Sequence, residues 1–198
     1  MSAIGPSAAT RPVRPAVAPT RGGQVANFVA FQLAWFAAVL GAAHQLPLWG
    51  TACLLAVIAW HIGIAARPKS EAALVGIACA IGFVFESAVA MQGHVEYPSG
   101  QPVDWLAPYW MVALWGELAI ALNVTMRWLK RRLWLASLLG AVGGPGAFSA
   151  GVALGGAQFV DKPAALLTLT CGYAVLMPLM VWFSNRFDGV SVPEAARV

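Results

Sequence analysis

Three ionisable side chains lie inside long apolar stretches of this sequence: His61, Glu86 and Glu117. Placing a charged group in the hydrocarbon of a bilayer costs at least about 2.5 kcal/mol, so each such residue is a candidate for function. Two carboxyl groups suit acid–base chemistry or proton transfer, and a histidine suits a ligand site or a switch. No nucleophile and base stand at a spacing that completes a catalytic set, so no catalytic residue is assigned.

The two glutamates differ in depth. Glu86 lies in GFVFESAVA near the outer end of its apolar stretch, whereas Glu117 in LWGELAIALN lies near the middle of the next one. At about 1.5 Å per helical residue, Glu117 is about 9 Å deeper, so direct proton sharing requires tilted helices or a water. Gly82 and Ala90 put small residues on the face of Glu86, which favours packing on a neighbouring helix. Two interpretations stay open: a proton, ion or head-group site, or a neutral carboxyl bonded across helices.

Further polar residues are expected near the inner face. His61 is close to the cytoplasmic end of its stretch, where a histidine that reaches the interface is favoured over a ligand. Gln32 and Asn123 are at a similar depth, as are Asn27 and Thr125. These side chains either form one polar cluster with His61 or make separate hydrogen bonds between helices.

The elements that carry these residues follow from composition. Hydrophobic residues make up 60% of the 198 residues and charged residues 10%, which leaves too little polar surface for a soluble fold. The apolar residues form blocks of about twenty, the length that crosses a bilayer as a helix. The sequence predicts an all-α integral membrane protein, a bundle of six transmembrane helices. The expected spans are residues 26–43, 48–66, 72–91, 105–126, 133–157 and 163–184.

Lysine and arginine test this count, because they gather in cytoplasmic connections. Eleven of the twelve basic residues fall in the two tails and the second and fourth connections; Lys162 is the exception. Both termini are therefore predicted to be cytoplasmic. The net charge of +4 reflects topology and contact with anionic lipid, so nucleic acid is not expected as a partner.

Three segments are predicted: residues 1–24, a disordered cytoplasmic tail; residues 25–185, the membrane domain; and residues 186–198, a short cytoplasmic tail. The first apolar block is too long for a cleaved signal, so an uncleaved helix is favoured. The cysteines lack zinc or disulfide spacing. Four potential ligands on the outer face also lack a pre-organising spacing, so no metal and no cofactor is expected. They are His44, His94, Glu96 and Asp104.

A glycine-rich stretch, GAVGGPGAFSAGVALGG, covers residues 140–156. It lacks the lysine of a phosphate-binding loop and the preceding strand of a dinucleotide fold. Gly143, Ala147, Gly151 and Gly155 recur every four residues, a face that lets membrane helices approach closely. Because proline removes a helical hydrogen bond, the fifth helix is expected to kink or break at Gly144–Pro145. Either it is a kinked packing helix, or the break lines a cavity.

Four stretches resemble DUF2878, a family of uncharacterised bacterial inner-membrane proteins. They are NFVAFQLAWF at 27–36, APYWM and LW within 107–115, LN and RWL within 122–129, and GAVGGP with AG and LG within 140–155. The resemblance runs from about residue 26 to 160 and implies no activity. It implies an acidic residue at the position of Glu86 and an apolar one at that of Glu117. The family's genes neighbour those of fatty-acid-modifying and flavin-dependent enzymes, which associates it with lipids.

Three functions follow as hypotheses. The preferred one is a non-catalytic accessory or scaffold component linked to membrane-lipid modification, with lipids and a membrane protein as partners. The first alternative is a small transporter built on the fifth helix and Glu86. The second is an intramembrane enzyme acting on lipid, with Glu86 or Glu117 as acid or base. Since no catalytic set is evident, an enzyme is disfavoured.

Overall fold

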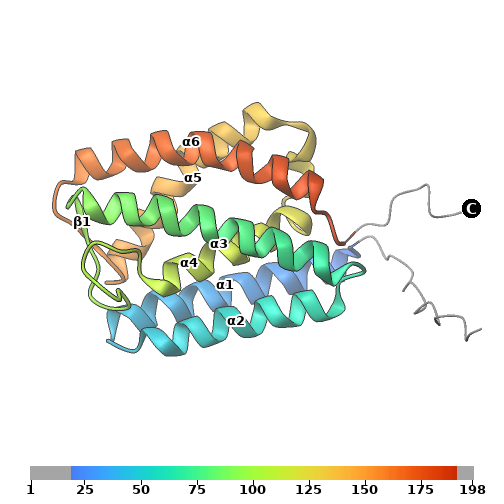
Figure 1. Ribbon diagram of the computed structural model, residues 1–198, viewed down its shortest axis with the longest axis horizontal. Helices are drawn as coiled ribbons and strands as arrows, with labels where there is room; N and C mark the ends of the chain where they lie inside the picture. Colours follow the sequence, from blue (N-terminus) through green and yellow to red (C-terminus); the bar gives the residue numbers. More distant parts are fainter. Residues whose placement is uncertain (1–18, 191–198) are drawn as a thin grey trace, which may run out of the picture.

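The computed structural model describes residues 19–190, most of which are helical. Figure 1 shows the helices lying side by side along one axis, with a small pair of strands at one end. The elements are α1 (Arg21–Ala43), α2 (Pro47–Ile64), α3 (Pro68–Met91), β1 (Val95–Glu96), α4 (Tyr109–Asn123), the 3-10 helix η1 (Arg127–Arg131), α5 (Leu133–Ala153), β2 (Gln158–Phe159) and α6 (Lys162–Arg186). The predicted tails lie largely outside the described residues, although residues 21–24 already belong to α1.

Local sequence fixes where these helices begin. Thr20 caps α1 by accepting a hydrogen bond from the Gly23 amide, and Asp161 caps α6 through the Ala164 amide. The helices α2, α3 and α6 carry proline in their first turn, where the missing amide hydrogen costs nothing. Within each helix the apolar block then continues until polar or glycine residues end it.

Within residues 19–190, five helices are long and apolar enough to cross a membrane: α1, α2, α3, α5 and α6. The expected span 105–126 is the exception, because α4 has only 15 residues and is therefore about 22 Å long. Eleven of those residues are buried. The block is apolar because α4 lies inside the bundle against other helices. A sixth crossing is therefore not confirmed.

The helix α5 continues through Pro145 from Leu133 to Ala153, so it does not break there, and the kink at Gly144–Pro145 stays a prediction. The residue before a proline normally avoids the helical conformation, because its Cβ clashes with the proline ring. Gly144 has no Cβ and removes that clash. Proline is also tolerated in membrane helices because neighbouring helices satisfy the freed backbone groups.

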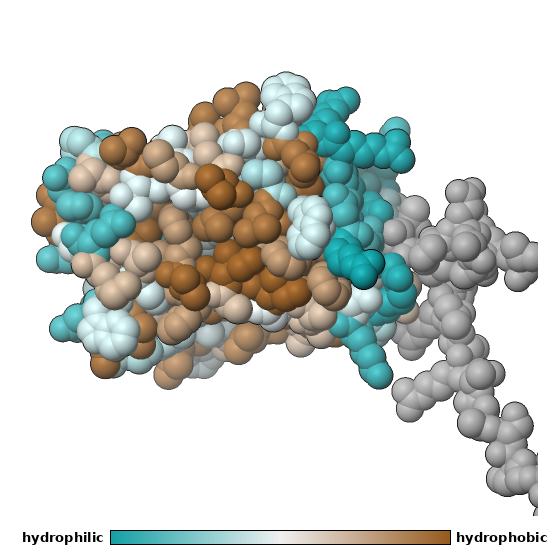
Figure 2. Space-filling model, turned by 45° about the horizontal axis from the view of Figure 1, so that its top comes forward, coloured by the Kyte–Doolittle hydropathy of each residue, from teal (hydrophilic) through white to brown (hydrophobic). Residues whose placement is uncertain are grey.

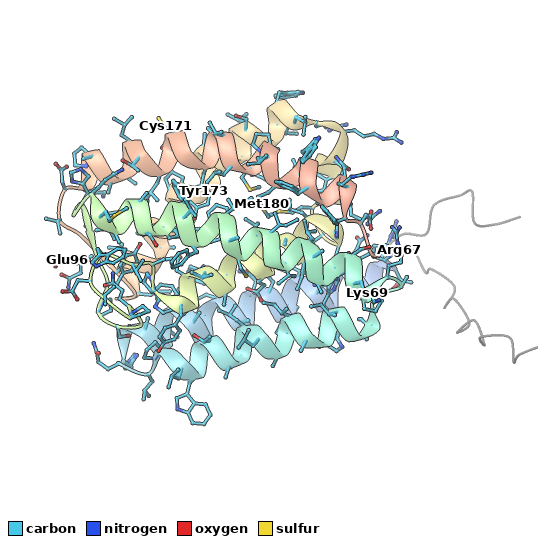
Figure 3. The ribbon with its side chains drawn as sticks, in the orientation of Figure 1. Arg67, Lys69, Glu96, Cys171, Tyr173 and Met180 are labelled. Atoms are coloured by element: carbon cyan, nitrogen blue, oxygen red, sulfur yellow. The ribbon has the colours of Figure 1, made fainter. Side chains whose placement is uncertain are left out.

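The bundle has two distinct ends. The antiparallel pair β1–β2 lies at one of them, the hairpin end, with Val95 opposite Phe159 and Glu96 opposite Gln158. The other, the basic end, carries Arg67 and Lys69 and both ends of the described chain (Figure 3). Figure 2 shows apolar residues across the middle and hydrophilic residues at both ends, densest at the basic end. This distribution is that of a protein surrounded by lipid.

Candidate functional site

Glu86 lies at the centre of an aromatic cluster. Its side chain is fully buried on α3, and Oε1 accepts hydrogen bonds from Trp115 Nε1 on α4 and the Tyr173 hydroxyl on α6, both 3.0 Å long. The Trp115 and Tyr173 rings stack with centroids 5.3 Å apart, and the Phe85 ring meets both edge-on. Figure 3 shows Tyr173 on the inner side of α6 and Cys171 on the outer side. One carboxyl oxygen therefore joins three helices.

Tyr97, from the connection after β1, lies beside the same carboxyl. Burial raises the pKa of Tyr97, and the nearby charge of Glu86 raises it further. The Tyr97 hydroxyl and Glu86 Oε2 are both buried and make no hydrogen bond of normal geometry to residues 19–190. Within the described chain, Glu86 accepts hydrogen bonds from Trp115 and Tyr173, so its carboxyl links α3 to α4 and α6.

A cavity of about 270 Å³ lies on the other side of the Trp115 and Tyr173 rings. We call it the α5 groove. Its walls come from residues 31–39 of α1, 110–118 of α4 and 139–151 of α5, with Tyr173 and Met177 of α6 behind them. The lining is almost entirely apolar, and Gly143 and Ala147 on its rim are exposed. The groove therefore opens on the side that faces lipid.

Two faces of the glycine-rich helix α5 have different surroundings: one lines the groove and the other packs on α6. Gly143, Ala147 and Gly151 line the groove, and a Cβ on Gly143 would meet no atom closer than 3.9 Å. Within the described residues, Gly143 and Ala147 are exposed and Gly151 is buried, with an added Cβ 4.0 Å from Val39 of α1, so the packing role of this face stays a prediction. Close packing falls on Gly140 and Gly144, where a Cβ would overlap Tyr173 of α6. Gly155, past the end of α5, has a φ of +84°, and a Cβ there would lie 3.3 Å from Ala43.

Glu117 does not join this site. It follows Trp115 by two positions on α4, and residues two apart on a helix point in nearly opposite directions. Its side chain is buried, and neither carboxyl oxygen has a hydrogen-bond partner within residues 19–190. The structure thus separates the two carboxyl groups that a dual acid–base mechanism would need.

A second polar cluster lies at the basic end, around Glu71 in the first turn of α3. This carboxyl is fully buried. Its Oε2 is 2.8 Å from His61 Nε2, and Oε1 accepts hydrogen bonds from Asn123 Nδ2 at 2.8 Å and the Gly189 amide at 2.6 Å. The structure therefore brings His61 and Asn123 together, as one of the two interpretations of the sequence expected, but through Glu71.

Asp188 extends this cluster to the connection between α4 and α5. Lys130 Nζ donates to Asn123 Oδ1 at 2.7 Å and lies 2.8 Å from Asp188 Oδ2, while Arg127 lies 2.9 Å from the same oxygen. Burial lowers the pKa of Lys130, and the bond to Asp188 opposes that shift. Arg67 donates to the Asp188 carbonyl. Residues 187–190 are thereby held against α3 and η1.

The remaining predicted polar residues lie apart from this cluster. Thr125 lies just past the end of α4 and donates to the carbonyl of Ala121 in the last turn of that helix, at 3.3 Å. Asn27 is buried with Oδ1 unpaired within the described chain, and Gln32 is half-buried outside the network. Sequence reasoning missed Glu71 and Asp188, because both were assigned to connections or tails. The one sequence feature that could have indicated Glu71 and Asp188 is that each is an acidic residue within an otherwise basic segment.

The hairpin end holds no candidate metal site. His44 Nδ1 bonds to the carbonyl of Leu40, 2.8 Å away, and Glu96 lies on β1. Among residues 19–190, no three His, Cys, Asp or Glu side chains come together as ligands would. Cys53, Cys79 and Cys171 are all free.

Replacing Glu86 with leucine is expected to leave the Trp115 and Tyr173 donors without an acceptor and lower the free energy of unfolding by about 1–3 kcal/mol. Glu86→Gln is the matched control, because its amide oxygen still accepts both bonds. Near-ultraviolet circular dichroism reports the stacked rings directly. Equal loss of the aromatic signal in both variants would contradict the anchoring role of Oε1.

These helices and clusters define a helical, membrane-type protein with an apolar intramembrane groove. Its sequence matches the family model described as "Protein of unknown function (DUF2878)" over residues 24–179. The chain belongs to this family, as the resemblance predicted. Comparisons with curated proteins and with solved structures gave no match.

Proposed function

We propose that this protein is a non-catalytic membrane component that holds a hydrocarbon chain of a membrane lipid in the α5 groove. In this role it serves lipid modification as an accessory or scaffold for a membrane-protein partner. The single observation that carries the proposal is the groove of about 270 Å³ with its apolar lining and exposed glycine rim.

The shape and chemistry of the groove favour a hydrocarbon chain. From Leu139 to Gly151 it follows α5 for about 18 Å, so it is a long slot. An apolar cavity of this kind stays dry and takes apolar ligands. The surrounding lipid supplies such chains at high concentration, and the rim at Gly143 and Ala147 gives them a lateral entrance.

The alternatives have less support from the same residues. An enzyme needs two reactive groups near one substrate atom, whereas Glu86 is tied to two donors and Glu117 points elsewhere on α4. A transporter needs a polar path, whereas neither Pro145 nor the Glu71 cluster lines the groove. The non-catalytic role therefore fits the geometry best.

The proposal also includes the orientation of the protein in the membrane and its cellular location. Arg67, Lys69 and η1 lie at the basic end together with both ends of the described chain. Cytoplasmic surfaces of membrane proteins carry such residues, so we place both termini in the cytoplasm. Because of the family resemblance, we propose that this membrane is the bacterial inner membrane.

A glycine pair on α5 tests chain binding. Gly143→Leu is expected to fill the groove and prevent labelling of its walls by a phospholipid with a photoreactive acyl chain. Gly146→Leu is the control, because Gly146 is equally exposed and open but does not line the groove. Labelling at exposed Leu55 of α2 measures contact with bulk lipid. Peptide mapping compares groove labelling with that reference.

The proposal predicts that the wild-type protein and Gly146→Leu label residues 31–39 and 139–151 above the Leu55 reference, and that Gly143→Leu does not. Wild-type labelling that merely equals the reference would refute chain binding. So would equal labelling in both leucine variants.

A further inference from the structure

One end of the α5 groove lies close to basic residues. Met126 is the last lining residue before η1, and η1 covers the segment Arg127–Arg131. On α5, the lining begins at Leu139, about 10 Å along the helix from Arg132. A chain in the groove would therefore approach this segment at one of its ends.

The basic residues of this connection divide into two pairs. Arg127 and Lys130 are partly buried and lie 2.9 and 2.8 Å from Asp188 Oδ2, so that carboxylate offsets their charge. Arg131 and Arg132 are exposed, and neither pairs with a carboxylate in the described part of the chain. Two unpaired positive charges therefore lie near the end of the groove that approaches η1.

The start of α5 adds to this positive character. No side chain caps the helix at Arg132. The amides of Leu135 and Ala136 bond to the Arg132 carbonyl, so the amides of Leu133 and Trp134 remain at the positive end of the helix dipole. Trp134 in the first turn is 70% exposed, as suits a residue at the head-group level of a membrane. The segment combines unpaired arginines, free helix amides and an interfacial tryptophan.

We infer that the ligand of the α5 groove is an anionic glycerophospholipid, with an acyl chain in the groove and its phosphate at Arg131 and Arg132. This inference rests on the proposed function and adds the class of lipid. The argument is charge complementarity at the end of a hydrocarbon-lined slot. The distance of about 10 Å between Arg132 and the first lining residue of α5 leaves room for a glycerol backbone.

The experiment uses the full-length protein in nanodiscs that contain a photoreactive phosphatidylglycerol or a photoreactive phosphatidylcholine with the same acyl chains. A single arginine near an anionic head group contributes about 1 kcal/mol, so with two arginines we expect groove labelling by phosphatidylglycerol to exceed that by phosphatidylcholine at least about fivefold. In Arg131→Gln/Arg132→Gln this ratio should fall to about one, while labelling by phosphatidylcholine persists.

A charge-matched control separates a site from a charged surface. Lys69→Gln/Arg186→Gln removes two exposed basic residues from the ends of α3 and α6, at the same end of the bundle. It should keep the fivefold ratio. A ratio near one in the wild-type protein, or an equal loss in both double variants, would overturn the inference. Absence of groove labelling by either lipid would instead refute chain binding itself, so the two failures are distinguishable.

Discussion

Replacing Glu71 with leucine is expected to lower the free energy of unfolding by about 3–5 kcal/mol, because it removes one partner of a buried, charged network. Glu71 accepts hydrogen bonds from His61, Asn123 and the Gly189 amide. Leucine can accept none of them, so three buried donors lose their partner at once. Thermal unfolding of the purified protein in detergent measures the loss.

Glu117→Leu is the matched comparison. Glu117 is as deeply buried as Glu71, but neither of its carboxyl oxygens has a partner among residues 19–190. Leucine there removes an unpaired polar group, so we expect unchanged or increased stability. A loss for Glu117→Leu as large as that for Glu71→Leu would show that burial of any carboxyl, and not the bonding of Glu71, determines the effect.

The Glu71 network also predicts which segment of the Glu71→Leu variant unfolds first. The Gly189 amide and the Arg67 amide tie residues 187–190 to α3, the latter through the Gly189 carbonyl at 2.9 Å. Limited proteolysis of Glu71→Leu should therefore cut near Asp188 before it cuts within any helix. Segments held by few contacts open at low free energy.

The length of apolar blocks predicts most of this fold. Five of the expected spans correspond to helices long enough to cross a membrane, because lipid imposes a minimum length on them. The fourth differs because hydropathy does not distinguish a helix buried in lipid from one buried in protein. Trp110 and Ile120 of α4 are apolar for the second reason, being 1% exposed within the bundle.

The candidate site could be predicted only in part. Depth in the membrane singled out Glu86, His61 and Asn123, and all three are buried, Glu86 in the aromatic cluster and the other two in the polar cluster around Glu71. Glu71 was not predicted because its partner Gly189 lies 118 positions away along the chain, and such a contact leaves no periodic pattern in the sequence. Sequence spacing also could not decide which face of α5 packs and which leaves a groove.

Gly140→Ala is expected to be destabilising, although alanine normally favours a helix over glycine by about 1 kcal/mol. A Cβ on Gly140 would overlap the Tyr173 carbonyl oxygen and lie 2.7 Å from Met177 Cγ. Since a backbone atom cannot turn aside, α5 and α6 must separate. Overpacking of this kind costs about 1–3 kcal/mol, so after the gain in helix propensity we expect a net loss of up to about 2 kcal/mol.

Gly143→Ala, three positions along the same helix, is the control for propensity. Its Cβ would meet only Leu139 Cδ1, at 3.9 Å, so the helix gains stability without a clash. Both variants share the gain in helix propensity, so thermal unfolding should separate them by about 1–3 kcal/mol, the overpacking cost alone. Similar stabilities would mean that α5 and α6 do not meet at Gly140. The groove wall would then lack its rigid support, because Tyr173 holds both α5 and Glu86.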